Sequence, residues 1–120
     1  MVDDDKNFTT LVKTYLERTG EFEVMTVNQG SEGVKAARKF LPDLILLDIM
    51  MPDKMGDFVA DELKYSRDLK EIPVVFLTAV VTKEKIEESS GTIGGRVFLS
   101  KPVALEELKS CILTNIKKTA

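Results

Sequence analysis

The chain has 120 residues, of which 43% are apolar and 31% are charged, and its formal net charge is −3. This length and balance suit one globular domain over residues 1–120, and the net charge gives no overall attraction to nucleic acid or to an anionic membrane. A single cysteine, Cys111, excludes an internal disulfide and a cysteine-based zinc cluster, and the absence of histidine excludes histidine triads, histidine metal ligands and a phosphohistidine on this chain.

Neither a membrane span nor a secretion signal is visible in the sequence. No apolar run approaches the roughly 20 residues that a helix needs to cross a bilayer. The first five residues are largely acidic, whereas a signal peptide begins with basic residues and continues with an apolar run. We therefore expect a cytoplasmic protein without membrane association.

Hydrophobic patterning predicts helices and strands that alternate along the whole chain. The first helix has an apolar stripe that includes Phe8 and Leu16, with Asp5 as a candidate N-cap and Gly20 as its stop. Ser31 is the candidate N-cap of the second helix. The expected helices cover approximately residues 6–19, 31–41, 57–66, 82–90 and 104–116. The expected strands cover residues 1–2, 22–27, 44–48, 74–78 and 97–100.

The strand over residues 44–48 is the centre of this pattern. Four consecutive large apolar residues end abruptly at Asp48, which is typical of a strand buried on both faces of a sheet. The helix that follows offers Phe58 and Val59 as candidate core residues. Alternation of strands and helices predicts an α/β fold with a parallel sheet and helices on both faces, and right-handed crossovers limit it to a doubly wound topology.

Polar groups follow several of these strands directly. Asp3 and Asp4 follow the first, Asp48 and Thr78 each end a strand, and Lys101 follows the last. Because the carboxyl ends of parallel strands lie at one edge, we expect three carboxylates, a hydroxyl and an ammonium to share a small crevice. Two carboxylates 4 Å apart repel by about 4 kcal/mol at an effective dielectric of about 20. Oxygen ligands alone favour Mg²⁺, with Mn²⁺ as a substitute, as the ion that neutralises them.

The segments that carry this argument also carry a resemblance to a known family. They are Val2-Asp3-Asp4-Asp5, Leu47-Asp48-Ile49-Met50-Met51-Pro52, Gly56, Thr78-Ala79 and Lys101-Pro102. In type, order and spacing they closely resemble the receiver domain of bacterial two-component response regulators, and the resemblance covers essentially the whole chain. It implies a flavodoxin-like sheet with strand order 2-1-3-4-5, of which the first strand is truncated here.

The resemblance implies a role for each matching residue. Asp48 would accept a phosphoryl group, and Thr78 and Lys101 would contact its oxygens. Asp3 and Asp4 would hold Mg²⁺ together with the carboxylate of Asp48 and the backbone carbonyl of Met50. The Lys101–Pro102 peptide bond would be cis, and Phe98 would occupy an aromatic position that turns inward in the active state.

The resemblance also implies partners. The phosphoryl donor would be a sensor histidine kinase or a phosphotransfer protein, and the protein would not be an enzyme but a phosphoacceptor that assists its own phosphoryl transfer and dephosphorylation. Output would go to a downstream protein effector, or to an effector domain in a larger chain, without direct contact to nucleic acid. Whether the domain forms a homodimer is left open.

Other interpretations of the same residues stay open at this point. Taken singly, Asp3 and Asp4 can be a solvated acidic start, Thr78 an ordinary strand residue and Lys101 a surface lysine. A pseudo-receiver, which keeps the fold but serves as a phosphorylation-independent protein-interaction module, is the main alternative. A phosphatase of the haloacid-dehalogenase kind also uses a strand-end aspartate, but it needs a second aspartate where this chain has Met50.

Overall fold

A computed structural model of the chain describes residues 1–79, 82–88, 92–93 and 96–116. The helices are α1 (Lys6–Arg18), the 3₁₀ helix η1 (Gly30–Glu32), α2 (Gly33–Phe40), α3 (Gly56–Tyr65), α4 (Lys83–Glu88) and α5 (Leu105–Asn115). The strands are β1 (Ile45–Asp48), β2 (Val74–Thr78), β3 (Thr92–Ile93) and β4 (Arg96–Ser100). The elements therefore alternate largely as the sequence pattern predicts.

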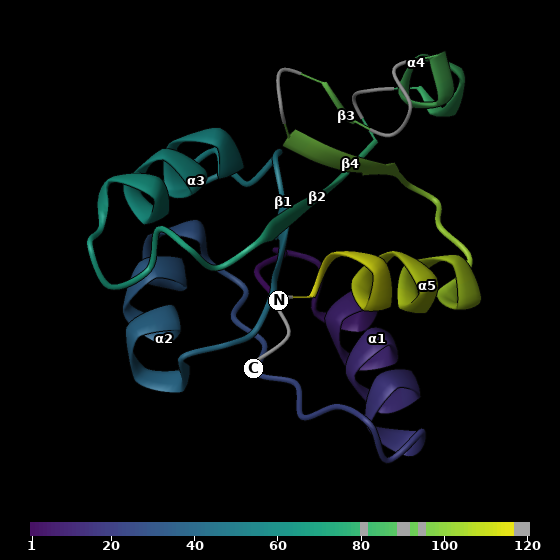
Figure 1. The fold of residues 1–120 in the computed structure, drawn as a ribbon, viewed down its shortest axis with the longest axis horizontal. Helices are drawn as coiled ribbons and strands as arrows, with labels where there is room; N and C mark the ends of the chain where they lie inside the picture. Colours follow the sequence, from purple (N-terminus) through teal and green to yellow (C-terminus); the bar gives the residue numbers. More distant parts are fainter. Residues whose placement is uncertain (80–81, 89–91, 94–95, 117–120) are drawn as a thin grey trace.

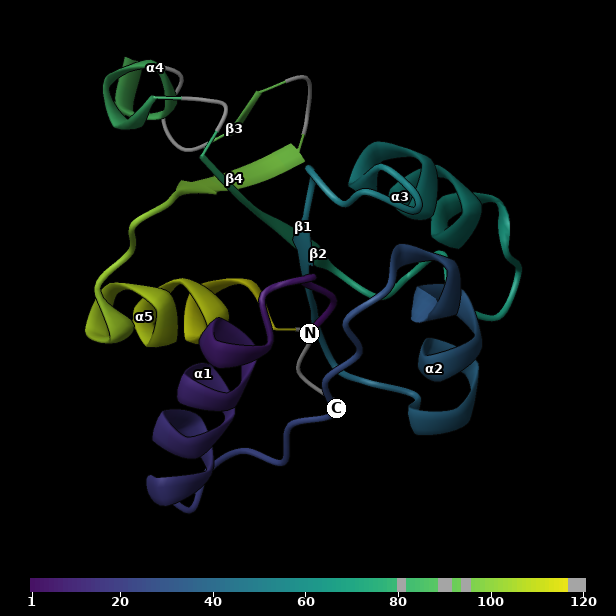
Figure 2. The same cartoon turned by 180° about the vertical axis from the view of Figure 1, so that it is seen from behind.

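The strands form one sheet in the order β1-β2-β4-β3. The pairs β1–β2 and β2–β4 are parallel, whereas β3 pairs with β4 in the antiparallel sense. Helices α1 and α5 lie on one face of the sheet and α2 and α3 on the other, and α4 lies apart, beyond β4 (Figures 1 and 2). The predicted α/β class, with a parallel sheet between two helical layers, is confirmed.

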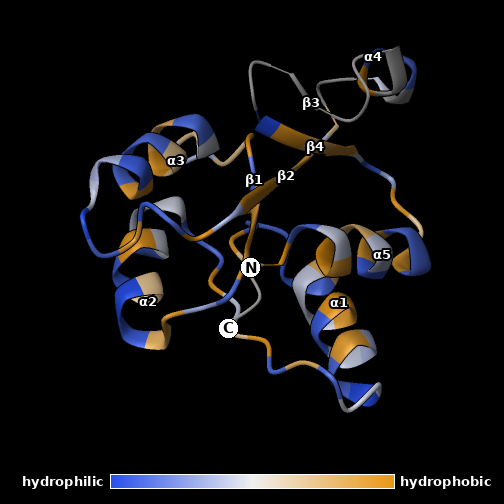
Figure 3. Ribbon diagram, viewed as in Figure 1, coloured by the Kyte–Doolittle hydropathy of each residue, from blue (hydrophilic) through white to orange (hydrophobic). Residues whose placement is uncertain are grey.

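The sheet separates two hydrophobic clusters, because side chains of a strand point alternately to its two faces. In β1, Ile45 and Leu47 pack with the cluster under α2 and α3, whereas Leu46 packs with the cluster under α1 and α5. The strands are accordingly mostly hydrophobic, apart from polar residues at some of their ends, while the helices carry both hydrophobic and polar stripes (Figure 3). Phe76 of β2 is 1% exposed and is among the largest fully buried side chains of the described residues.

The strand order 2-1-3-4-5 is not confirmed, because the first two predicted strands are not strands in the structure. Residues 22–26 have no strand pairing, and only Val27 forms a parallel bridge, to Val2. Val2 forms a second parallel bridge, to Leu47 of β1. A continuous β-ladder needs paired residues along its length, but only Met1 and Val2 lie between the segment 22–27 and β1. The antiparallel strand β3 was missed by the pattern analysis.

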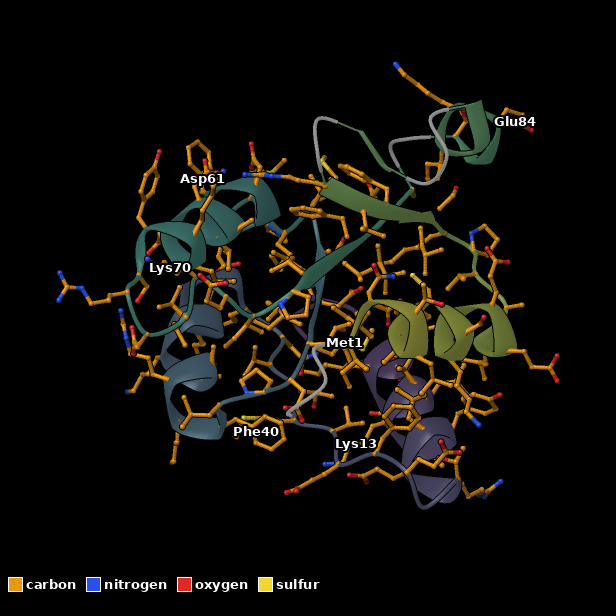
Figure 4. The ribbon with its side chains drawn as sticks, viewed as in Figure 1. Met1, Lys13, Phe40, Asp61, Lys70 and Glu84 are labelled. Carbon is orange, nitrogen blue, oxygen red and sulfur yellow. The ribbon has the colours of Figure 1, made fainter. Side chains whose placement is uncertain are left out.

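A cavity of about 280 Å³ opens where that ladder is missing. Its lining comes from residues 21–25 on one side and 40–46 on the other, with Ile112 and Ile116 of the α5 region. Met1 is also part of the lining, and its ammonium donates to the carbonyl oxygen of Met25 at 2.8 Å. Figure 4 places Met1 in the middle of the molecule, between the two helical layers. Burial lowers the pKa of this amino group from 8.0 to about 6.

The helix ends agree with the predictions only in part. Asp5 caps α1 and accepts from the backbone N–H of Phe8 at 3.1 Å, as expected. Gly20 follows α1 with a φ of 78°, in the left-handed region that favours glycine. Ser31, however, does not cap the second helix with its side chain. The carboxylate of Asp53, from a distant loop, instead accepts from its backbone N–H.

One core residue predicted for the third helix is exposed. Phe58 is 60% exposed, so the prediction that it faces the core is wrong, while its neighbour Val59 is fully buried. Gly91, Gly94 and Gly95, which the sequence predicts to form a flexible approach to the strand over residues 97–100, lie outside the described residues. Among the helices that the structure describes, none is both long and apolar enough to cross a membrane.

Candidate functional site

The predicted site residues converge at the carboxyl edge of the sheet. Asp48 and Thr78 are the last residues of β1 and β2, and Asp3 follows Val2, which bridges to β1. Register holds these ends level, because Asp48 pairs with Leu77 and Thr78 with Ser100. Asp3 and Thr78 are fully buried and Asp48 is 5% exposed. A buried carboxylate is costly unless positive charge or hydrogen bonds compensate for it, so Asp3 and Asp48 require such partners at this edge.

Lys101 supplies positive charge to this edge. Its Nζ lies 2.7 Å from Oδ2 of Asp3 and 3.7 Å from Oδ2 of Asp48. The backbone N–H of Lys101 donates to the carbonyl oxygen of Thr78 at 2.9 Å, which ties the start of this loop to the end of β2. The Lys101–Pro102 peptide bond is cis, as the resemblance implies. The lysine is therefore a partner of two buried carboxylates and not a surface residue.

A second set of hydrogen bonds fixes Asp3. Its Oδ1 accepts from the backbone N–H of Asp5 at 3.0 Å, and its backbone carbonyl accepts from Nδ2 of Asn28 at 2.8 Å. The same Asn28 nitrogen donates to Oγ1 of Thr9 at 3.1 Å. Asn28 was not among the candidate site residues predicted from the sequence. No local pattern identifies it, because its partners are far away in the chain.

The pKa of the Asp48 carboxyl lies well above its usual value. Burial raises its pKa from 3.8 to about 6, the nearby charge of Asp3 adds to this, and Lys101 and the N–H of Met50 act in the opposite direction. That N–H donates to Oδ1 of Asp48 at 3.3 Å. The raised pKa means that burial and the charge of Asp3 destabilise the ionised carboxylate more than Lys101 and the N–H of Met50 stabilise it. One ammonium shared between Asp3 and Asp48 is not enough to stabilise both carboxylates.

The acidic residues fit a divalent cation. Carboxylate oxygens of Asp3, Asp4 and Asp48 can be chosen that all lie within 4.8 Å of one another. Asp3 and Asp48 are buried and Asp4 is exposed, so the cluster faces solvent on one side. Oxygen-only donors are the ligands that Mg²⁺ and Mn²⁺ accept, and Lys101 is shared between the two buried carboxylates. The carbonyl of Met50 as a further ligand stays a prediction.

The loop between β1 and α3 is held tightly against the site. The N–H of Gly56 donates to the carbonyl oxygen of Ile49 at 2.7 Å. A Cβ at Gly56 would clash with the carbonyl oxygen of Asp48 and lie 2.8 Å from Cα of Ile49, so only glycine fits there. Asp53 accepts from the N–H groups of Gly30 and Ser31, each at 3.0 Å, and these bonds lower its pKa.

Phe98, the expected aromatic switch residue, lies two residues before the end of β4. Its ring stacks on Phe76 of β2 with centroids 5.1 Å apart and planes inclined by 20°. The guanidinium of Arg96 lies 5.5 Å from the centroid of Phe76 and forms an ion pair with Asp61 of α3 at 2.6 Å. Phe98 is therefore partly buried against the core, and its movement on activation stays a prediction.

Comparisons with known proteins agree with this geometry. A family model described as response regulator receiver domain matches residues 1–113. The chain is 37% identical over 108 residues to the transcriptional regulatory protein RprY of Bacteroides fragilis, covering 90% of this chain and 44% of RprY. It is 33% identical over 114 residues to the polar-differentiation response regulator DivK of Brucella ovis, covering 92% of this chain and 91% of DivK.

A solved structure supports the same likeness. The chemotaxis protein CheY4 of Vibrio cholerae aligns with a TM-score of 0.79 at 27% identity, covering 96% of this chain and 94% of that chain. The chain spans about half the length of the transcriptional regulators that it matches, and most of the length of DivK.

Proposed function

The chain belongs to the response regulator receiver family, and from this premise we propose that Asp48 is its phosphoacceptor and that residues 1–120 form one receiver domain. The observation that carries the proposal is the buried cluster of Asp3, Asp48 and Lys101 at the carboxyl edge of the sheet. Asp48 combines a strand-end position with a carboxylate whose pKa is raised to about 6. A bound cation would stabilise the ionised form of this carboxylate, which is the nucleophile in phosphoryl transfer.

Each residue has a part in the proposed transfer. An ionised oxygen of Asp48 attacks phosphorus, an O–P bond forms, and the P–N bond to the donor imidazole breaks with its electron pair moving to the ring nitrogen. Lys101 pairs with the phosphoryl oxygens and Thr78 donates its hydroxyl to one of them. Asp3, Asp4, Asp48 and the carbonyl of Met50 hold Mg²⁺, which supplies positive charge that neutralises the carboxylates and the phosphoryl oxygens.

Residues 1–120 contain no histidine, so the phosphohistidine that serves as donor lies outside them. We assign that role to a sensor histidine kinase or a phosphotransfer protein. Phosphorylation then shifts the domain between two conformations, and output goes to a protein effector, or to an effector domain if the chain belongs to a longer regulator. With a net charge of −3, the domain itself is proposed to contact protein and not nucleic acid.

Incubation with acetyl phosphate tests the proposal, because this small donor needs no partner protein. We expect intact-mass spectrometry to show one phosphoryl group per chain in the presence of Mg²⁺, and none with a chelator. Asp48→Asn should abolish the gain. Asp43→Asn, which changes an exposed residue just before β1 and away from the carboxyl edge, is the matched control and should leave it intact.

The same experiment decides between this function and the pseudo-receiver. A chain that folds, binds no Mg²⁺ at millimolar concentration by calorimetry and gains no phosphoryl group would contradict the proposal. Asp4→Asn separates the two steps, because Asp4 is exposed and its loss should weaken Mg²⁺ binding about tenfold or more without unfolding the chain. An unchanged Mg²⁺ affinity in this variant would remove Asp4 from the ligand set.

A further inference from the structure

The Lys101 ammonium contacts an aromatic ring in addition to its two carboxylates. Its Nζ lies 5.0 Å from the centroid of Phe8, on the α1 side of the site. A cation within about 6 Å of a ring centroid is attracted by the negative face of the ring. The ammonium is thus held by an ion pair to Asp3, a longer one to Asp48 and a cation–π contact to Phe8.

The ring of Phe8 is fixed by the same turn of chain that fixes Asp3. The N–H of Phe8 donates to Oδ1 of Asp5, and the N–H of Asp5 donates to Oδ1 of Asp3. Phe8 is partly buried and packs against the hydrophobic cluster under α1 and α5. The ring and the carboxylate therefore approach the ammonium from one hydrogen-bonded segment, residues 3–8.

We propose that Phe8 is a positioning residue that keeps the Lys101 ammonium beside Asp48 for the incoming phosphoryl group, an inference that rests on the function proposed above. Lysine has a long flexible side chain, and at 2.7 Å its closest ion-pair partner is Asp3. Asp3 is also a proposed metal ligand, so its charge cannot serve Lys101 and a divalent ion in full at the same time. The ring of Phe8 is uncharged and does not coordinate a divalent ion, so its attraction for the Lys101 ammonium persists when the ion is bound.

A purely structural role makes a different prediction. Phe8 is also part of the apolar stripe of α1, and in that role size and shape alone matter, so leucine or a fluorinated ring would serve equally well. A positioning role through the ring face depends on its electron density, which fluorine withdraws with little change in shape. The two roles are therefore separable at one position.

The experiment measures the rate of phosphorylation by acetyl phosphate at saturating Mg²⁺ for a series at position 8. We expect Phe8→Leu to lower this rate about threefold to tenfold and Phe8→Tyr to keep it within about twofold. Phenylalanine carrying one, three and five fluorines at position 8 should lower the rate stepwise. The Mg²⁺ affinity should stay within about twofold throughout, because Phe8 offers no ligand. The same fluorinated residues at Phe22, which packs in the same cluster, are the control and should have no effect.

A second readout does not depend on phosphorylation. In protein labelled with ¹³C at lysine Cε, ring current should move the Lys101 εCH₂ protons upfield, Phe8→Leu should remove this shift, and Phe8→Tyr should retain it. Lys101→Arg assigns the signal by its loss. If the parent protein takes up no phosphate, the proposed function fails, and this spectrum alone tests the placement of the ammonium. A flat fluorine series in an active protein, or a Lys101 signal without an upfield shift, would overturn the inference.

Discussion

Asp48 and Met1 are two buried ionisable groups whose charges oppose folding in opposite pH ranges. Burial and Asp3 raise the pKa of the Asp48 carboxyl to about 6, so the native state binds its proton more tightly than the unfolded chain does. Burial lowers the pKa of the Met1 amino group to about 6, so the native state binds that proton less tightly. By linkage, Asp48 makes stability fall as the pH rises from about 4 to about 6, and Met1 makes it rise from about 6 to about 8.

Asp48→Asn should therefore stabilise the metal-free protein. In the presence of a chelator at pH 8, we expect the free energy of unfolding in urea to increase by about 1–3 kcal/mol, because the amide keeps the volume and removes a buried charge. The gain should shrink as the pH falls through about 6 and disappear near pH 4, where the native and unfolded carboxyls of the parent are both protonated. A gain of the same size at every pH would show that charge is not its cause.

At the scale of single elements, the loop between β1 and α3 has no spare volume. A Cβ at Gly56 would meet only backbone, the carbonyl of Asp48 and Cα of Ile49, and backbone cannot rotate away as a side chain can. We expect Gly56→Ala to lower the free energy of unfolding by about 3 kcal/mol or more and to reduce phosphate uptake, because Asp48 must move with its carbonyl.

Gly20→Ala is the matched comparison for that variant. Gly20 has a φ of 78° but no neighbouring atom within 4 Å of an added Cβ, so only the backbone conformation is strained. A loss of about 1–2 kcal/mol is expected, with phosphate uptake unchanged. Equal losses of stability in the two variants, measured by urea unfolding, would contradict the packing argument for Gly56.

The elements that sequence patterns predicted correctly are those whose cause is local. β1, β2 and β4 follow from continuous apolar runs, and α1 follows from its stripe and the Asp5 cap. The proximity of the Asp3, Asp4 and Asp48 carboxylates follows from their places at or just after the ends of parallel segments. The prediction of a strand over residues 22–27 was wrong, although Phe22 and Val24 do pack against the core. Alternation of apolar and polar residues predicts that a segment is half-buried, but it does not show that a neighbouring strand is present to pair with it. β3, with two residues, is too short to show a period.

Contacts across the chain set the parts of the site that no pattern could predict. Asn28 reaches the carbonyl of Asp3, Asp53 caps η1 from another loop, and Phe8 lies under Lys101. Each of these residues has an ordinary local explanation as a turn, loop or stripe residue. Only the folded chain brings them to partners at least 22 residues away.

At the scale of the whole molecule, the cavity beside Met1 interrupts a sheet that otherwise runs from Val27 through Val2 to β4. Val2 donates to the carbonyl of Leu46 and accepts from the N–H of Asp48, and the N–H of Val27 donates to Met1. These bonds set the register that any further residue ahead of Met1 would continue, in parallel with β1. The lining is mostly apolar, so an extended apolar segment suits it.

Extending the chain by Ile-Val-Ile ahead of Met1 should therefore stabilise the fold. We expect a gain of about 1–3 kcal/mol in urea unfolding at pH 7, from apolar burial and from an amide N–H that replaces the buried ammonium as donor to Met25. The rise in stability between pH 6 and pH 8 should also disappear. A Gly-Ser-Gly extension, which removes the charge but fills no space, is the control. If both extensions had the same effect, the cavity would not accept a strand.

The ion pair of Lys101 with Asp3 affects the metal-free state of the domain. Lys101 provides positive charge to the buried carboxylates of Asp3 and Asp48, so the chain can fold around them without a bound metal ion. A metal ion that bound Asp3 would therefore compete with Lys101 for this carboxylate. Under the proposed function, the ammonium released in this way would be the group that pairs with the phosphoryl oxygens, so we expect phosphorylation to depend on the magnesium concentration.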